Sequence, residues 1–300
     1  MNAKKYSFEI WCAFREKARI FSGHTAVISP SGQVTFKELY AKAGQIADTL
    51  SESGIREGDL IGLALPNMIN FVTSFLALCR LSAIVALISP KYQSSELKAI
   101  LDNLSPRCFL VSLAQIDDFE RRISPYRVGM VHTKVNDDTV CFSLGDNPTP
   151  AMRHPLLNDA ALIKFTSGST GEPKGIALSA ANILAETDNV VDTLMITNRD
   201  RILAVVPVSH SYGFDLGVLA MLSSGATLML QDSFIPRRIL ADFESKGITI
   251  FLGVPSMYRF FLETPINKPP ELSHIRYLLS CTAPLHPQLI DEFRDKFGMT

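Results

Sequence analysis

The chain has 300 residues, 47% of them hydrophobic, which is enough material for one large or two ordinary domains with buried sheets. Its 29 lysines and arginines nearly balance its 30 aspartates and glutamates, and neither sign forms a block. This balance argues against a nucleic-acid partner and against a polybasic membrane anchor. The five cysteines are widely spaced and form no CxxC pair, so we expect free thiols in a reducing cytoplasm rather than disulfides or a zinc site.

Neither the N-terminus nor the interior indicates membrane targeting. Lys4 and Lys5 lie near the start, but Glu9 interrupts the following residues, so no apolar core of a signal peptide develops. The one stretch that resembles a membrane span, residues 71–88, contains Arg80 near its centre and is better explained as a helix followed by a buried strand. We therefore expect a cytoplasmic protein without an integral membrane segment.

Apolar runs of strand length alternate with helical patterns along the chain, which predicts an α/β fold with largely parallel sheets. In the first part, the expected strands cover residues 60–65, 83–88 and 108–111, and the expected helices cover residues 68–81 and the segment with Leu97, Ile100, Leu101 and Leu104. Residues 137–155 are rich in Asp, Asn and Pro and predict irregular connections. Strands over residues 160–165 and 175–179 follow, and a helical pattern begins near Ala180.

A second series of elements occupies the rest of the chain. The expected strands cover residues 201–206, 226–230, 248–252 and 275–279, with helices over residues 236–246 and 287–297. Right-handed crossovers would place the helices on the faces of the sheets. The two series predict a first α/β subdomain over residues 1–190 and a second over residues 191–300.

The segment between the two strands near residue 170 is the most informative in the chain. Residues 166–175 read Thr-Ser-Gly-Ser-Thr-Gly-Glu-Pro-Lys-Gly and combine three glycines, four hydroxyls and a lysine. Glycines let backbone N–H groups converge on phosphate oxygens, and a lysine adds a mobile positive charge. The residues that we expect to bind phosphate are Thr166, Ser167, Gly168, Ser169, Thr170, Gly171 and Lys174.

This segment differs from an ordinary P-loop, because its lysine precedes a strand instead of opening a helix. A solvated hairpin turn is the alternative explanation for a loop of this composition. The combination of Lys174, the hydroxyls and Pro173 favours phosphate binding.

The segment resembles the phosphate loop of the adenylate-forming superfamily, which includes acyl-CoA synthetases, amino-acid adenylation domains and luciferases. Residues 58–67, 206–213 and 280–285 resemble other segments of that family in the same order, so the similarity covers nearly the whole chain. The resemblance implies two similar lobes of mainly parallel sheet flanked by helices, with ligands at the carboxyl ends of strands.

The resemblance also implies a reaction. Members of the family couple a carboxylic acid to ATP, release pyrophosphate and usually transfer the acyl group from the adenylate to CoA. Such chemistry needs positioning and charge neutralisation more than a protein nucleophile. The loop and Lys174 would hold the β- and γ-phosphates, and Mg²⁺ would bridge phosphate oxygens; we expect no dedicated metal ligands on this chain.

By the same resemblance, His210, Tyr212 and Gly213 border the pocket for the carboxylate, with Gly253 at the acyl tunnel. His210 would position the substrate, because a carboxylate is already ionised at neutral pH and needs no general base. A histidine in this place is otherwise more often a hydrogen-bonded structural residue, Tyr212 a packed aromatic, and Gly253 part of the core.

Residues 280–285 resemble the turn that contacts adenine, which makes Thr282, Ala283 and Pro284 the expected adenine-binding residues. Cys281 and Thr282 stand where the family often has glycines, so a plain strand-to-helix turn is the competing interpretation. Cys281 has no partner in the sequence that would mark it as an activated nucleophile.

The resemblance further implies a truncated N-terminal part of a longer enzyme, whose missing C-terminal part would complete the site. The leading hypothesis is a fragment of a carboxylate–CoA ligase that has little activity alone. One alternative is an amino-acid adenylation domain, because Asp215 resembles the aspartate that binds the substrate ammonium group there. A non-catalytic nucleotide-binding scaffold is the other.

Overall fold

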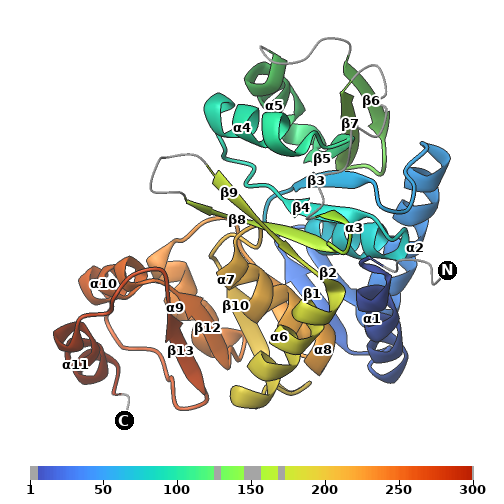
Figure 1. The fold of residues 1–300 in the computed structure, drawn as a ribbon. Helices are drawn as coiled ribbons and strands as arrows, with labels where there is room; N and C mark the ends of the chain where they lie inside the picture. Colours follow the sequence, from blue (N-terminus) through green and yellow to red (C-terminus); the bar gives the residue numbers. More distant parts are fainter. Residues whose placement is uncertain (1–5, 125–129, 145–156, 168–172, 299–300) are drawn as a thin grey trace.

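The computed structural model describes residues 6–124, 130–144, 157–167 and 173–298, which form two β-sheets and the helices that cover them (Figure 1). In chain order the elements are α1 (Phe8–Ile20), β1 (Thr25–Ser29), β2 (Gly32–Thr35), α2 (Phe36–Glu52), β3 (Leu60–Ala64), α3 (Ile69–Arg80), β4 (Ile84–Leu87), α4 (Ser94–Leu104), β5 (Cys108–Ser112), η1 (Leu113–Gln115), α5 (Ile116–Ile123), β6 (Met130–Lys134), β7 (Thr139–Leu144), β8 (Leu162–Ser167), β9 (Pro173–Leu178), α6 (Ala180–Thr193), β10 (Arg201–Ala204), α7 (Ser211–Gly213), η4 (Phe214–Leu219), α8 (Ala220–Ser224), β11 (Thr227–Leu230), α9 (Pro236–Ser245), β12 (Ile250–Gly253), α10 (Pro255–Glu263), β13 (Tyr277–Ser280) and α11 (Pro287–Phe297). The α/β class and the largely parallel sheets predicted from the sequence are confirmed.

The first sheet has the strand order β6-β7-β5-β3-β4-β8-β9. Its central strands run parallel, and β6, β7 and β9 run antiparallel to their neighbours. The irregular structure predicted for residues 137–155 is wrong for residues 139–144, which form β7 between β5 and β6. The Asp, Asn and Pro content of the whole segment had masked a short run, Thr-Val-Cys-Phe-Ser-Leu, that has the composition of a strand.

The second sheet has the order β13-β12-β10-β11-β1-β2, and its strands are parallel except for β2. Strands β1 and β2 come from the beginning of the chain, yet β1 pairs with β11. The two sheets therefore do not divide the chain at residue 190. The proposed subdomain boundary at that residue stays a prediction.

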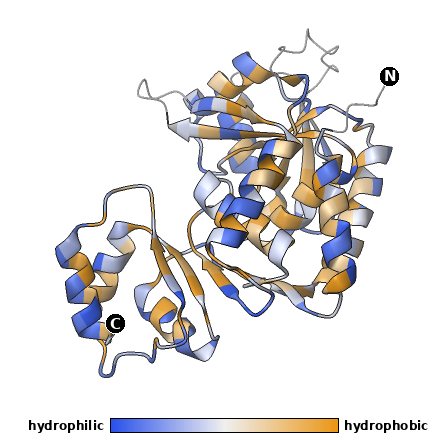
Figure 2. Cartoon of the chain, turned by 60° about the horizontal axis from the view of Figure 1, so that its bottom comes forward, coloured by the Kyte–Doolittle hydropathy of each residue, from blue (hydrophilic) through white to orange (hydrophobic). Residues whose placement is uncertain are grey.

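Alternation along the parallel strands divides the core into three apolar layers. Inward residues of both sheets, such as Leu63 and Leu228, share one cluster with helices α1, α2, α3, α6 and α8, so these helices lie between the sheets. Phe109 and its neighbours pack with α4 and α5, and Phe251 and its neighbours pack with α9, α10 and α11 on the opposite side. Figure 2 shows the hydrophobic residues gathered along the strands, with mixed character on the outer helices.

Residues 71–88, whose sequence resembles a membrane span, form most of α3 and all of β4 inside this core. Across the described residues, none of the helices combines the length and apolar character that crossing a bilayer requires. The cysteines are free thiols: Cys79, Cys108 and Cys141 are buried and Cys281 is exposed.

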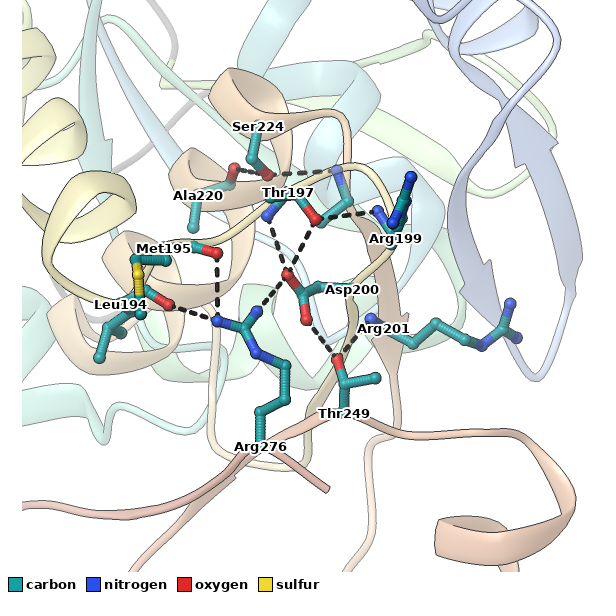
Figure 3. A network of polar contacts seen from close by, with 11 residues as sticks. Leu194, Met195, Thr197, Arg199, Asp200, Arg201, Ala220, Ser224, Thr249 and Arg276 are labelled. Atoms are coloured by element: carbon teal, nitrogen blue, oxygen red, sulfur yellow. Dashed lines mark hydrogen bonds and ion pairs between the residues drawn. The ribbon is translucent and has the colours of Figure 1, made fainter. Parts of the chain in front are cut away.

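A buried network around Asp200 holds together the amino ends of three strands in the second sheet (Figure 3). Asp200 accepts hydrogen bonds from Arg276 at 2.6 Å, from the Thr249 hydroxyl at 2.8 Å and from the Thr197 amide at 2.8 Å. Arg276 also donates to the carbonyls of Leu194 and Met195, at the end of α6. This network lies at the ends of β10, β12 and β13 opposite to those that carry the candidate site.

Candidate functional site

The predicted phosphate segment joins two antiparallel strands at the edge of the first sheet. The expected strand–loop–strand arrangement is confirmed, because β8 and β9 pair in register from Leu162–Leu178 to Ser167–Pro173. Gly168, Ser169, Thr170 and Gly171 lie outside the described residues. Ser167 belongs to β8, but its side chain is also outside the described part. In Figure 1 the hairpin crosses the middle of the molecule, between the part with α4 and α5 and the part with α10 and α11.

The register shows which face of the hairpin carries the predicted phosphate ligands. Thr166 and Lys174 lie directly opposite each other, so their side chains share one face, and both residues are exposed. Lys164 is two residues before Thr166 and therefore lies on the same face. The ammonium group of Lys164 contacts Asp215 in η4. The face with Thr166 and Lys174 is thus the one turned toward the segment that follows His210.

His210 caps the short helix α7 beyond the carboxyl end of β10. Its Nδ1 accepts a hydrogen bond of 3.4 Å from the Tyr212 amide, and its side chain is exposed. Gly213 allows α7 to pack closely against the preceding loop, because a Cβ at this position would come within 2.5 Å of the Pro207 carbonyl oxygen. A positioning role for His210 stays a prediction.

Tyr212 meets the carboxyl ends of β12 and β13. Burial raises the pKa of Tyr212, the nearby Cys281 thiol raises it further, and the Gly253 backbone opposes the shift. Its hydroxyl nevertheless makes no hydrogen bond of ordinary geometry with a described residue, and the same holds for the buried Ser280 hydroxyl. Two desolvated hydroxyls without partners are costly unless a ligand or water bonds them.

Gly253 allows Phe251 and Tyr258 to pack closely against the end of β12. A Cβ at Gly253 would lie 2.8 Å from the hydroxyl of Tyr258, a phenol that donates to the Leu279 carbonyl at 2.5 Å. Gly253 also pairs with Ser280 across the two parallel strands. The structure therefore brings Tyr212, Gly253 and the end of β13 near one another. Their role in a carboxylate pocket stays a prediction.

The expected adenine-binding turn follows β13 directly. Thr282, Ala283 and Pro284 are all exposed, and Cys281 is exposed beside them. Thr282 has a φ of 74°, in the left-handed region that favours glycine and disfavours β-branched residues. This backbone geometry explains why a glycine suits the position; adenine binding itself stays a prediction.

Asn67 has a positioning role that the sequence reasoning missed. Its buried amide donates to the carbonyls of Val206 at 2.9 Å and Gln231 at 3.1 Å, and its oxygen accepts from the Val208 amide at 2.9 Å. The end of β3 in the first sheet is thereby tied to the ends of β10 and β11 in the second. The only local signal was a polar residue directly after a buried strand, where the edges of α/β sheets carry their sites.

A buried ion pair beside the site was also missed. Lys164 lies 2.6 Å from Asp215 and 3.1 Å from Glu186, in α6. Burial raises the pKa of Asp215 to about 6, against the opposing effect of Lys164, while the negative charge of Glu186 adds to the rise. The signal in the sequence was a lysine inside the apolar run Ala-Leu-Ile-Lys-Phe.

The donor chemistry of the described residues fits a polyphosphate better than a bare metal ion. Thr166 offers a hydroxyl and Lys174 an ammonium group on one exposed face. Within the described ranges, no group of three or more His, Cys, Asp or Glu side chains is arranged to hold a metal.

Comparisons with known proteins identify the family of this chain. The model of the family described as "AMP-binding enzyme" matches residues 14–300. Oxalate–CoA ligase of Arabidopsis thaliana is 28% identical over 285 residues, which are 90% of this chain and 55% of that protein. A 4-coumarate–CoA ligase of the same plant is 27% identical over 298 residues, covering 96% of this chain and 52% of that protein.

Solved structures show the same fold. A long-chain-fatty-acid–CoA ligase from Archaeoglobus fulgidus superimposes with a TM-score of 0.80 at 24% identity, over 98% of this chain and 61% of that one. The o-succinylbenzoate–CoA synthetase from Bacillus subtilis has a TM-score of 0.76 at 23% identity, over 95% and 71% of the two chains. The chain spans about half the length of the curated relatives that it matches.

Proposed function

The chain belongs to the AMP-binding enzyme family, and from this premise we propose that its complete protein converts a carboxylic acid and ATP to an acyl-adenylate and pyrophosphate. Transfer of the acyl group to CoA would follow. The observation that carries the proposal is the orientation of the β8–β9 hairpin. Its polar face, with Thr166 and Lys174, turns toward η4, where Lys164 of the same face contacts Asp215, two residues after Gly213. The buried Tyr212 and Ser280 hydroxyls, which have no partner of ordinary geometry among the described residues, support a ligand site at the nearby strand ends.

In the proposed reaction the carboxylate attacks the α-phosphorus, and pyrophosphate leaves. The chain's part is to bind and orient both reactants and to neutralise charge on the leaving group. Lys174 and the phosphate segment would hold the β- and γ-phosphates, and Mg²⁺, when bound, would supply further positive charge to the leaving pyrophosphate. His210, Tyr212, Gly213 and Gly253 surround the carboxylate, and Thr282, Ala283 and Pro284 face the adenine.

The environment of Asp215 supports an acid without an α-ammonium group. An aspartate that binds an amino-acid substrate needs a free carboxylate in the pocket, but Asp215 is buried and paired with Lys164 at 2.6 Å. The positive charge of Lys164 would also repel a substrate ammonium. We therefore favour a carboxylate–CoA ligase over an amino-acid adenylation domain.

Pyrophosphate exchange by the complete protein tests the proposal against both alternatives. A panel should contain aliphatic, aromatic and dicarboxylic acids beside amino acids. Exchange with an uncharged acyl or aryl acid supports the proposed ligase. Exchange with amino acids alone would select the adenylation domain. No exchange with any acid, together with measurable ATP binding, would select the non-catalytic scaffold.

Replacing Lys174 tests its predicted role on the leaving pyrophosphate. Lys174→Ala in the complete protein should slow exchange about 100-fold, because one preorganised charge at a site of developing charge contributes on this scale. Lys174→Arg should recover part of the rate, since it keeps the charge with a different geometry. Lys37→Ala, an exposed lysine of α2, serves as the matched control and should leave the rate unchanged. Equal rates for the Lys174→Ala variant and the wild type would remove Lys174 from the mechanism.

A further inference from the structure

The ion pair between Lys164 and Asp215 joins the two halves of the candidate site. The side chains of Lys164 and Asp215 are 9% and 8% exposed, while Glu186, the second partner of Lys164, is 43% exposed. Lys164 comes from β8, two residues before Thr166, and Asp215 comes from η4, two residues after Gly213. One short contact therefore connects the strand that leads into the phosphate segment with the helix that follows the carboxylate segment.

The other contacts of η4 show why this ion pair matters for the position of the hairpin. Phe214 packs edge-on against Phe71 and Phe75 of α3, which fixes the apolar side of η4. Among the described residues, the contact of Lys164 with Asp215 is the one hydrogen bond between the hairpin strands and residues 205–219. This ion pair therefore adds a directional contact between the hairpin and η4 to the pairing of β8 with β4 in the sheet.

Stability alone does not account for a buried ion pair. Desolvation of two charges offsets much of their attraction, and well-packed apolar residues of similar volume often serve a fold equally well. A charged hydrogen bond does differ from apolar packing in direction, because it is favourable over a narrow range of distances and angles. Such a contact suits a place where two ligand-binding segments must keep one relative position.

We propose that Lys164 is a positioning residue for adenylation, and that its ion pair with Asp215 sets the distance between the phosphate-binding hairpin and the carboxylate pocket. The inference rests on the proposed function. Lys164 does not touch either substrate in this proposal. It acts through Asp215, by holding Thr166 and Lys174 opposite the segment that begins at His210.

The decisive variant is Lys164→Met combined with Asp215→Asn in the complete protein. Both side chains keep nearly their volume and lose their charge, so no buried charge is left unpaired; Glu186 is exposed enough to be solvated. We expect a melting temperature near that of the wild type and a pyrophosphate-exchange kcat lower by at least about 10-fold, with both KM values within about threefold, because small misplacements act on the reaction step. A double variant with both the kcat and the melting temperature of the wild type would overturn the proposal.

Two further variants keep the test clear. Lys164→Arg preserves a charged donor and should retain more of kcat than the Lys164→Met, Asp215→Asn double variant. This comparison still tests the proposal if the double variant folds poorly. Arg276→Met combined with Asp200→Asn removes a comparable ion pair at the opposite ends of the strands. This control should lower the melting temperature without changing the exchange rate of the folded protein. A loss of rate in the control as large as that in the Lys164 pair would refute a specific role.

Hydrogen exchange of backbone amides supplies a readout that does not require activity. In the Lys164→Met, Asp215→Asn double variant, the amides of β8, β9 and residues 205–219 should exchange hydrogen faster than in the wild type. The amides of β12 should exchange at the wild-type rate. Unchanged protection in both segments would overturn the coupling even if the enzyme is active. If the wild type exchanges pyrophosphate with no acid, the proposed function fails, and the protection pattern still decides whether the ion pair couples the two segments.

Discussion

The charge of Asp215 links this residue to the pH dependence of folding. Its folded pKa of about 6 lies above the ordinary aspartate value of 3.8, mainly because of burial. A carboxyl whose pKa rises on folding binds its proton more tightly in the folded state. Its ionisation therefore lowers the free energy of unfolding as the pH rises from about 3.8 through about 6, and the loss is complete above that range. Lys164 limits this loss, because its positive charge favours the ionised form.

Lys164→Met should consequently destabilise the protein more at high pH than at low pH. At pH 8 the variant leaves a buried carboxylate without its main partner, which costs about 4 kcal/mol. At pH 5 Asp215 is protonated in the variant, so the cost should be much smaller. Urea unfolding at both pH values measures the difference. The same substitution in an Asp215→Asn background is the control and should show little pH dependence; equal losses at pH 5 and pH 8 in the Asp215 background would contradict the argument.

Local patterns in the sequence were sufficient for some site residues and insufficient for others. Thr166 and Lys174 could be named as candidates because glycines, hydroxyls and a lysine lie within ten residues of one another; their role stays a prediction. The role of Asn67 depends on carbonyl and amide groups that are 139 to 164 positions away in the sequence. The partner of Lys164 is 51 positions away. Separations of this size leave no periodicity or spacing that a single sequence can reveal.

At the scale of elements, the segment from α7 through η4 has two glycines that differ in the room available for a side chain. A Cβ on Gly213 would meet a backbone atom, the Pro207 carbonyl oxygen, at 2.5 Å. A Cβ on Gly217, one turn later, would meet the flexible end of Leu228 at 3.3 Å. The first contact requires the backbone to move, whereas the second requires only a small adjustment of a side chain.

Gly213→Ala should therefore cost about 2 kcal/mol of unfolding free energy, in the range for overpacked sites, and should displace His210 from its place in the pocket. Pyrophosphate exchange should fall with it. Gly217→Ala is the matched control in the same helical segment and should change both quantities little. Chemical unfolding and exchange assays measure the two effects. If the two variants behaved alike, the close approach of α7 to Pro207 would not be the reason for a glycine at position 213.

Most strands from residue 60 onward could be predicted, because buried parallel strands are short apolar runs followed by turns. The helix over Pro287–Phe297 was predicted with its observed bounds, since a proline opens it and Gly298, with a φ of 65°, ends it. No element was assigned before residue 60, and β7 was missed inside a polar segment. The pairing of β1 with β11 could not be predicted at all, because strand partners separated by about 200 residues are chosen by tertiary packing.

At the scale of the whole molecule, the two sheets are joined by more than chain connections. Helices α1, α2, α3, α6 and α8 share one apolar cluster with both sheets. The early strands β1 and β2 complete the second sheet, although α2 and β3 then return the chain to the first. Asn67 adds the polar link at the edge where the candidate site lies, so the relative position of the two sheets also affects how the candidate site residues are arranged.

Asn67→Ala tests this link between the sheets. The variant leaves the buried Val206 carbonyl, Gln231 carbonyl and Val208 amide without a protein partner, which should cost about 3 kcal/mol of unfolding free energy. Urea unfolding measures this loss, and hydrogen exchange should show faster exchange at the Val208 amide. Asn70→Ala is the matched control, because the Asn70 side chain makes one exposed bond to the described residues, to Asp138 at 3.3 Å. A loss for Asn67→Ala no larger than that for Asn70→Ala would mean that apolar packing alone holds the two sheets together.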